Sequence, residues 1–399
     1  MADPALILDR RAALLGNPGL HAVLIGVSDY TFLPAADDPP GTGLLALRQL
    51  KSSALTAMAL SAKLQRLDTD KRLMRPLATI RLLVAPSPEE IAVDPALAAP
   101  GLVAPTIRNI ELALLNWRID VATQAENQAL FLFSGHGVRR SLEESILLAQ
   151  DFLEQPFAEM SRSFRLSNIR NGMAPSAKRP DIGREQFFFV DACRDKPEAL
   201  DGIDPIDPPA IFTADLNIYD DRKAPIFFAT TTGGVAAGEA GKPTYFGLAL
   251  LWALENGSFG KQSVAGIKGS VWPVNASSLK AGIEVADALF DARVELTGLV
   301  SNPVLCFRRD APEMTLKVWL EPADYKGHVG GVSMTEINTN KVTPVPGIGE
   351  MQLSIPITAG QYRMTVQPSS NRFAQASSEV TYFSIQMPMP WTFDLASVP

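Results

Sequence analysis

The sequence predicts an α/β domain with a mainly parallel sheet flanked by helices, followed by a C-terminal β-sandwich. Short apolar runs of strand length alternate with segments of helical periodicity along the first two thirds of the chain, which is typical of a parallel sheet with helical connections. Beyond Ala311, short segments alternate apolar and polar residues between Gly, Pro and Asn, which is typical of a small sandwich.

The elements of the α/β domain follow one another in a regular order. Each expected strand is a short apolar run, and each expected helix repeats its apolar residues every three or four positions. The expected strands cover residues 21–27, 79–84, 129–133, 187–190 and 225–229, and the expected helices cover residues 44–67, 106–122 and 244–255. In a parallel sheet, chemistry is expected where strands end at the carboxyl edge.

The chain is expected to divide into four parts. They are an N-terminal segment (1–19), the α/β domain (20–258), a connecting segment (259–310) and the β-sandwich (311–399). Within the α/β domain, residues 195–224 contain several prolines and a dense set of acids with few strand or helix signals, so a flexible linker loop is expected there.

Composition narrows the classes of partner. The formal net charge is −7, which argues against broad binding to nucleic acid, because that requires a basic face. The chain has no apolar run of about 18 residues and no secretory signal, so no membrane partner is expected. Two cysteines form no disulfide framework, which is typical of a reducing compartment. A cytoplasmic location is therefore expected.

The residues with the clearest chemical potential are His136 and Cys193. Among three histidines, only His136 is flanked by glycines directly after a buried strand, where the backbone can approach a ligand. Cys193 follows another apolar strand and lies 57 residues downstream, close to the spacing known for caspases. A thiol nucleophile needs a base and donors for the oxyanion. The backbone N–H groups of Gly137 and Cys193 are the expected donors. No third acidic partner of His136 is evident, so a dyad is expected.

Several motifs in the same order resemble the caspase-like family, which includes caspases, metacaspases and bacterial relatives. They are HAVLIGVSDYTFLP, GLLALRQLKSSALTAMALSAKL, FLFSGHG, FFFVDACRD and APIFFATTTGGVAAGEAGKPTYFGLALLWALENG. The resemblance covers about residues 20–258. It implies a caspase-like sheet, a His136–Cys193 catalytic dyad, and hydrolysis of peptide bonds in protein substrates through an acyl-enzyme.

The resemblance also indicates substrate-binding residues, which are Asp191, Ser134, Arg48 and Thr232. In metacaspases the acid two residues before the nucleophile helps to bind a basic side chain before the scissile bond, and Asp191 retains it. Where many relatives carry a second acid, this chain has Lys51-Ser52-Ser53-Ala54. An Arg near the position of Arg48 binds a substrate aspartate in animal caspases. The two residues indicate opposite specificities, and we favour a basic P1 residue through Asp191.

Regulation and cofactors are less constrained by the sequence. Bacterial members of the family often act as regulated proteases in signalling or antiviral defence, and the C-terminal sandwich is expected to dock a regulatory or sensor protein. The loop at 195–224 corresponds to a region that is often cleaved in relatives, and it contains Arg222-Lys223. No cluster has the spacing of zinc ligands, so no metal or other cofactor is expected. The sequence gives no evidence on activation by calcium.

Two alternatives remain open. The first is a binding or scaffold protein on the same fold, which has little intrinsic activity and needs a partner for turnover. The second is a hydrolase of another class, such as an α/β-hydrolase. The missing G-x-S-x-G motif counts against that class.

Overall fold

The computed structural model forms two compact units. The first contains Met1–Ala253 and Asn275–Cys306, and the second contains Leu254–Val274 and Phe307–Pro399. The structure describes residues 3–35, 47–139, 144–158, 160–193, 207–213, 219–229, 238–298, 301–310, 313–321, 329–337, 340–344, 352–358, 360–369, 376–382 and 391–394.

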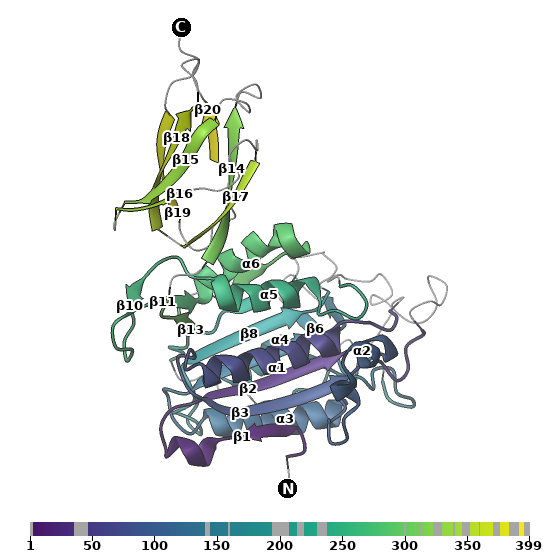
Figure 1. The fold of residues 1–399 in the computed structure, drawn as a ribbon. Helices are drawn as coiled ribbons and strands as arrows, with labels where there is room; N and C mark the ends of the chain where they lie inside the picture. The colour runs from purple at the N-terminus through teal and green to yellow at the C-terminus, as the bar shows by residue number, and fades with distance from the viewer. Residues whose placement is uncertain are drawn as a thin grey trace. The chain divides into compact units, whose positions relative to one another are not determined.

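A seven-stranded sheet forms the centre of the first unit, with the order β1-β3-β2-β4-β8-β9-β12 (Figure 1). The strands are β1 (Leu6–Asp9), β2 (Leu20–Val27), β3 (Leu77–Ala85), β4 (Gln128–Ser134), β8 (Glu185–Asp191), β9 (Ile226–Phe228) and β12 (Glu295–Thr297). The five inner strands are parallel, and the two edge strands are antiparallel to their neighbours. The predicted α/β class with a mainly parallel sheet is confirmed.

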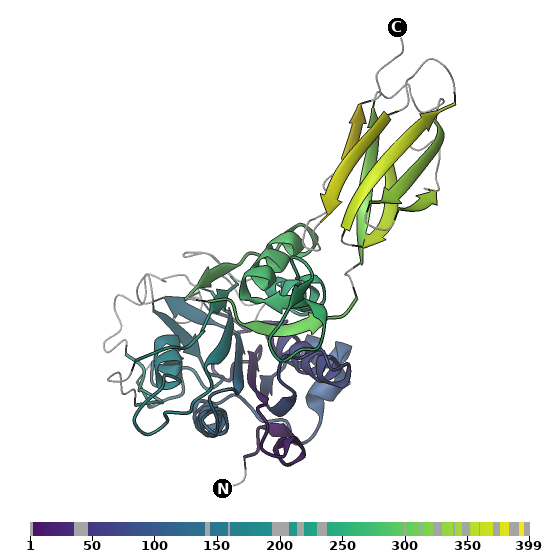
Figure 2. The ribbon, with the colours of Figure 1, turned by 90° about the vertical axis from the view of Figure 1, so that its left-hand side faces the viewer.

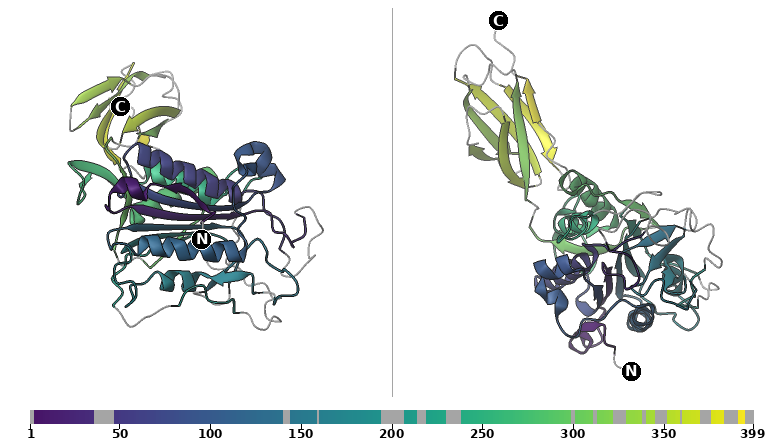
Figure 3. Two further views of the ribbon diagram at one scale, coloured as in Figure 1. Left: turned by 90° about the horizontal axis from the view of Figure 1, so that it is seen from below. Right: turned by 90° about the vertical axis from the view of Figure 1, so that its right-hand side faces the viewer.

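Helices cover both faces of this sheet. Helices α1 (Ser53–Thr69) and α5 (Tyr245–Asn256) lie on one face, and α3 (Ile107–Val121) and α4 (Leu166–Gly172) lie on the other (Figures 1 and 3). Alternate residues of the strands point to opposite faces, so β2 buries residues on both sides. This burial on both faces explains why the inner strands appear in the sequence as continuous apolar runs.

Further elements belong to the first unit. They are η1 (Arg11–Leu14), α2 (Pro88–Val93), η3 (Pro95–Ala98), α6 (Ala276–Phe290) and a small antiparallel sheet of β5 (Gly137–Arg139), β6 (Ser145–Leu148) and β7 (Ser163–Arg165). Strand β13 (Val304–Arg308) includes the residues at which the division between the units falls. The range 259–310, which was expected to connect two domains, thus contributes α6 and the edge strand β12. A strand of three residues is too short to give a period-two signal in the sequence.

The first long helix begins nine residues later than predicted, at Ser53 rather than at residue 44. Its first N–H groups are satisfied from other segments, because Ser28 Oγ accepts from Ser53 N at 2.9 Å and Glu90 Oε1 accepts from Leu55 N at 3.0 Å. A helix end needs such partners for its unpaired N–H groups. Leu47 and Leu50 pack on the core from the preceding non-helical segment, which explains why their spacing resembled a helix.

The second unit contains a hairpin, β10 (Gln262–Ser263) with β11 (Ser270–Asn275), and two further sheets (Figure 2). One sheet has the order β17-β14-β20, and the other has the order β16-β15-β18-β19. Their strands are β14 (Glu313–Glu321), β15 (Val329–Glu336), β16 (Lys341–Pro344), β17 (Gln352–Thr358), β18 (Gly360–Pro368), β19 (Ala376–Tyr382) and β20 (Trp391–Asp394). On β15 and β18 the buried residues face each other in register, Val332 with Val366 and Met334 with Met364. The predicted alternation of apolar and polar residues is found here.

The expected linker loop at 195–224 is described only at 207–213 and from residue 219 onward. There the chain packs closely against the rest of the first unit. The Arg222 side chain is 2% exposed, pairs with Asp220 at 2.7 Å and donates to Arg170 O at 2.6 Å. Lys223 N donates to Arg184 O at 2.8 Å, so the chain is already aligned beside β8. The Arg222–Lys223 pair therefore lies in ordered, hydrogen-bonded backbone rather than in an exposed loop.

Candidate active site

The strand register brings the two candidate catalytic loops together. In the parallel pair β4–β8, Ser134 lies opposite Asp191. His136 and Cys193 each follow two residues later, so both leave the same edge of the sheet at the same level. They line one cavity of about 200 Å³. Its other lining residues are Gln49, Leu50, Lys51, Ser52, Ser53, Gly135, Asp191, Gly238, Ala240 and Thr244.

His136 is held at two points. Its backbone N–H donates to the phenol oxygen of Tyr30 at 2.6 Å, and its Nε2 lies 2.5 Å from the backbone oxygen of Arg48. A carbonyl oxygen can only accept, so Nε2 carries the proton. In a neutral imidazole Nδ1 is then the acceptor nitrogen. Burial lowers the pKa of His136 to about 4, so this neutral form predominates near neutral pH.

The cysteine loop packs closely against the histidine loop. Cys193 is partly exposed. Burial raises the pKa of the nearby Tyr30 phenol, and a thiolate at Cys193 would raise it further. A Cβ atom at Gly137 would lie 2.9 Å from Ala192 Cβ and 3.0 Å from Cys193 O. Only glycine allows this approach without displacement of the neighbouring loop. The assignment of the Gly137 and Cys193 N–H groups as oxyanion donors stays a prediction.

Asp191 presents one side of its carboxylate to buried hydroxyl groups. Its Oδ2 accepts from Ser134 Oγ at 2.7 Å and from Thr244 Oγ1 at 2.6 Å. Its Oδ1 is buried and has no hydrogen-bond partner within the described part of the chain. Burial raises the pKa of Asp191 to about 6, against the two hydroxyl bonds, which lower it. Burial of a carboxylate oxygen without a hydrogen bond costs free energy.

Two of the predicted substrate-binding residues have other positions. Ser134 is fully buried, donates to Asp191 and does not itself line the cavity, so its assignment to substrate binding stays a prediction. Arg48 does not line the cavity either, and it contributes its backbone oxygen to His136. Thr232 lies outside the described residues.

Sequence reasoning missed three residues that shape the site. Tyr30 holds the backbone of His136, Gln49 holds the backbone of Tyr30, and Thr244 holds Asp191. Tyr30 could have been found, because it lies three residues after the end of β2, at the same carboxyl edge. Gln49 and Thr244 leave no such signal, since their roles depend on contacts between distant segments.

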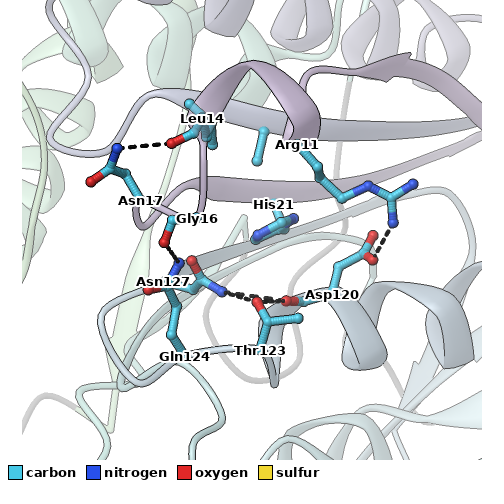
Figure 4. Close-up of a pocket in the computed structure, with 10 residues that line it drawn as sticks. Arg11, Leu14, Gly16, Asn17, His21, Asp120, Thr123, Gln124 and Asn127 are labelled. Atoms are coloured by element: carbon cyan, nitrogen blue, oxygen red, sulfur yellow. Dashed lines mark hydrogen bonds and ion pairs between the residues drawn. The ribbon is translucent and has the colours of Figure 1, made fainter.

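A second, larger cavity of about 310 Å³ lies at the opposite edge of the sheet, where β2 begins (Figure 4). Its polar side chains pair mainly with one another. Arg11 binds Asp120 at 2.6 Å and also Asp9, and Asn127 donates to Thr123 at 2.8 Å. His21 is buried beside Thr79, and burial lowers its pKa to about 4. These contacts join the N-terminal segment to the end of α3, so this cavity is a structural junction.

The described part of the chain shows neither a metal cluster nor a spanning helix. Among the residues with described positions, no group of three or more His, Cys, Asp or Glu side chains could hold a metal ion. Within the same part of the chain, no helix combines the length and the apolar character that crossing a membrane requires.

The fold and the site define a caspase-like cysteine peptidase: a histidine and a cysteine leave neighbouring parallel strands at one sheet edge and share a cavity. The family profile of the caspase domain matches residues 20–267, more than half of the chain, and the chain belongs to this family. Proteases of this family act on protein substrates. The chain is also similar to the crystal structure of caspase-1 from Spodoptera frugiperda, with 12% sequence identity, a TM-score of 0.39, and coverage of 71% of this chain and 87% of that chain. No curated protein matches the sequence.

Proposed function

We propose that this protein is a cysteine endopeptidase that cleaves protein substrates through a His136–Cys193 dyad. One observation carries the proposal: Nε2 of His136 is bound to the backbone oxygen of Arg48 at 2.5 Å, which leaves Nδ1 as the basic nitrogen in a cavity shared with Cys193. A neutral imidazole with a fixed tautomer is suited to general-base catalysis. The Arg48 carbonyl takes the orienting role that an acidic side chain has in a triad.

The reaction proceeds in two steps. The Cys193 thiol transfers its proton to Nδ1 of His136 while its sulfur attacks the scissile carbonyl, and the N–H groups of Gly137 and Cys193 stabilise the oxyanion. The imidazolium then returns the proton to the departing amine, which leaves a thioester on Cys193. A water molecule hydrolyses this thioester, with His136 again as the base. The chemistry requires no cofactor.

The cavity favours a basic residue before the scissile bond. Oδ1 of Asp191, which has no hydrogen-bond partner among the described residues, offers a charge-assisted contact to an arginine or lysine side chain. Such a contact would also compensate for the cost of burying the ionised carboxylate. Lys51 at the rim of the cavity opposes a cationic substrate, but its Nζ is paired with Glu89 at 2.7 Å. The net preference is therefore basic.

The biological setting is proposed by analogy with the family. A regulated role in bacterial signalling or defence, a cytoplasmic location and a regulatory protein that docks on the C-terminal sheets agree with the sequence expectations. The alternative is a scaffold protein that retains the dyad and cleaves only after a partner binds.

A peptide assay with a matched cysteine control tests the proposal. Wild type, Cys193→Ala and Cys306→Ala are incubated with fluorogenic peptides that carry Arg, Lys or Asp at P1. Cys306 is fully buried, so its replacement controls for loss of a thiol away from the cavity. We expect cleavage of the Arg and Lys peptides by wild type and Cys306→Ala only. Equal cleavage by Cys193→Ala would rule out the proposed His136–Cys193 dyad. Cleavage by wild type only after a partner is added would favour the scaffold alternative.

A further inference from the structure

The contact between His136 and Arg48 joins two segments that are far apart in the chain. His136 lies after β4, whereas Arg48 lies in the non-helical segment before α1. The contact fixes the tautomer only while both segments keep their relative position. A displacement of about 1 Å in such a contact can lower a rate by roughly a hundredfold.

Both segments are anchored on the same residue, Tyr30, which is fully buried. On one side, the phenol oxygen of Tyr30 accepts the backbone N–H of His136 at 2.6 Å, and the two rings lie 5.0 Å apart. On the other side, the Gln49 side chain forms two hydrogen bonds with the Tyr30 backbone. Gln49 Oε1 accepts from Tyr30 N at 2.5 Å, and Nε2 donates to Tyr30 O at 2.7 Å.

The amide of Gln49 is fully committed to this position. Its second N–H donates to the backbone oxygen of Leu33 at 3.0 Å. An amide nitrogen has two donors, so none is left for a substrate, although Gln49 lines the cavity. Gln49 is the residue directly after Arg48, and its three side-chain bonds therefore hold the Arg48 carbonyl in place.

We propose that Gln49 is a positioning residue, which acts through Tyr30 and Arg48 to hold His136 in its Nε2–H tautomer. The inference rests on the proposed function, since it assigns Gln49 a part in that same site. Without the Gln49 hydrogen bonds, the Arg48 carbonyl shifts, and the neutral His136 imidazole becomes a mixture of its two tautomers. The Nδ1–H tautomer cannot accept the thiol proton. Peptidase activity is then expected to fall about 10- to 100-fold.

Three variants separate this role from a general effect on folding. Gln49→Leu removes all three bonds at similar volume. Gln49→Glu keeps an oxygen that accepts from Tyr30 N. Only the protonated glutamate can donate, and then to just one of the two carbonyl oxygens, Tyr30 O or Leu33 O. Gln124→Leu is the matched control, because Gln124 also donates one side-chain bond to a backbone oxygen, Gly16 O at 3.2 Å, but at the far edge of the sheet.

The readouts are the tautomer of His136, from two-bond ¹H–¹⁵N spectra, and the pH profile of peptide cleavage. With three histidines in the chain, His136 can be assigned by comparison with His136→Gln. We expect the Nε2–H tautomer in wild type and Gln124→Leu and a mixture in Gln49→Leu. In Gln49→Glu, activity relative to wild type should fall as the pH rises, since the ionised carboxylate faces two carbonyl oxygens.

The outcomes distinguish the two proposals. An unchanged tautomer and an unchanged pH profile in folded Gln49→Leu and Gln49→Glu would overturn the role of Gln49, even if wild type cleaves peptides. If the wild type cleaves no peptide and Gln49→Leu still shifts the His136 tautomer, the result would support the positioning role of Gln49 and count against the peptidase. If Gln49→Leu does not fold, the relative pH profile of Gln49→Glu decides, and a flat ratio across pH overturns the proposal.

Discussion

The two edges of the central sheet differ in how their polar groups are satisfied. At the amino edge, a cavity of about 310 Å³ is lined by side chains that pair with one another, such as Arg11 with Asp120. At the carboxyl edge, the cavity is smaller, about 200 Å³, but it contains a carboxylate oxygen without a partner in the described structure and a histidine with a fixed tautomer. We therefore use unsatisfied hydrogen-bonding groups and a free proton acceptor, rather than cavity size, to choose the carboxyl edge as the proposed reactive edge.

This difference predicts opposite responses to substitution. At the carboxyl edge, substitutions should change activity more than stability. At the amino edge, they should change stability and leave the activity of folded molecules unchanged.

The largest effect is expected for the dyad itself. His136→Gln and Cys193→Ala should each lower kcat/KM for a P1 arginine peptide by about 10⁴-fold or more, and the double variant should lose no more than either single variant, because residues that act as one unit are not additive. Steady-state kinetics on all three variants checks this. Additive losses would mean that the two residues do not act together.

At the amino edge, Asp120→Ala should destabilise the protein without affecting the chemistry. Asp120 is buried between Arg11 and Arg81, at 2.6 and 2.7 Å. Removal of one member of a buried ion pair costs about 3–5 kcal/mol, because it leaves a buried charge uncompensated. Urea denaturation measures the loss. A change in kcat/KM at temperatures where the variant is folded would contradict the separation of the two edges.

Asp191→Asn should change both the specificity and the pH dependence. Discrimination in favour of P1 arginine over a neutral P1 residue should fall about 10- to 100-fold, which corresponds to loss of a charge-assisted hydrogen bond. In wild type, kcat/KM for the P1 arginine peptide should rise as the pH increases through about 6, where Asp191 ionises. This rise should be absent in Asp191→Asn. A profile that is the same in both proteins would exclude Asp191 from P1 binding.

Ionisation of Asp191 should also affect stability: the free energy of unfolding should fall as the pH rises, whereas kcat/KM should rise. The pKa of Asp191 is about 6 in the folded state and 3.8 in an unperturbed carboxyl group. Between these values the unfolded chain releases the proton first, so the folded state loses stability as the pH rises. Asp191→Asn should flatten this slope between about pH 4 and pH 6. Urea midpoints across this range provide the measurement.

The smallest effect concerns Lys51 at the cavity rim. Lys51→Gln removes a partly exposed positive charge, so kcat/KM for P1 arginine should rise about two- to threefold at low salt and less at high salt. Stability should change by less than about 1 kcal/mol. An equal change for a neutral P1 peptide would show that the effect is not electrostatic.

The sequence predicted those parts of the site that depend on residue type and strand order. His136 and Cys193 could be paired because each follows a buried strand, and neighbouring parallel strands end at the same edge. The partner of His136 could not be predicted, because every residue type has the same backbone oxygen. The sequence predicted a role for the Arg48 side chain, whereas the contact uses its backbone oxygen. The start of α1 was misplaced because Leu47 and Leu50 pack on the core without a helix.

The position of Arg222-Lys223 has a consequence for how the protein survives its own proposed activity. This dibasic pair is withheld from attack only once the chain has aligned beside β8, where Lys223 N binds Arg184 O and Gln186 N binds Lys223 O. Newly synthesised copies in which the sheet has not yet formed would still expose this pair to folded, active molecules of the same protein. A basic preference would then remove incompletely folded copies and spare mature ones.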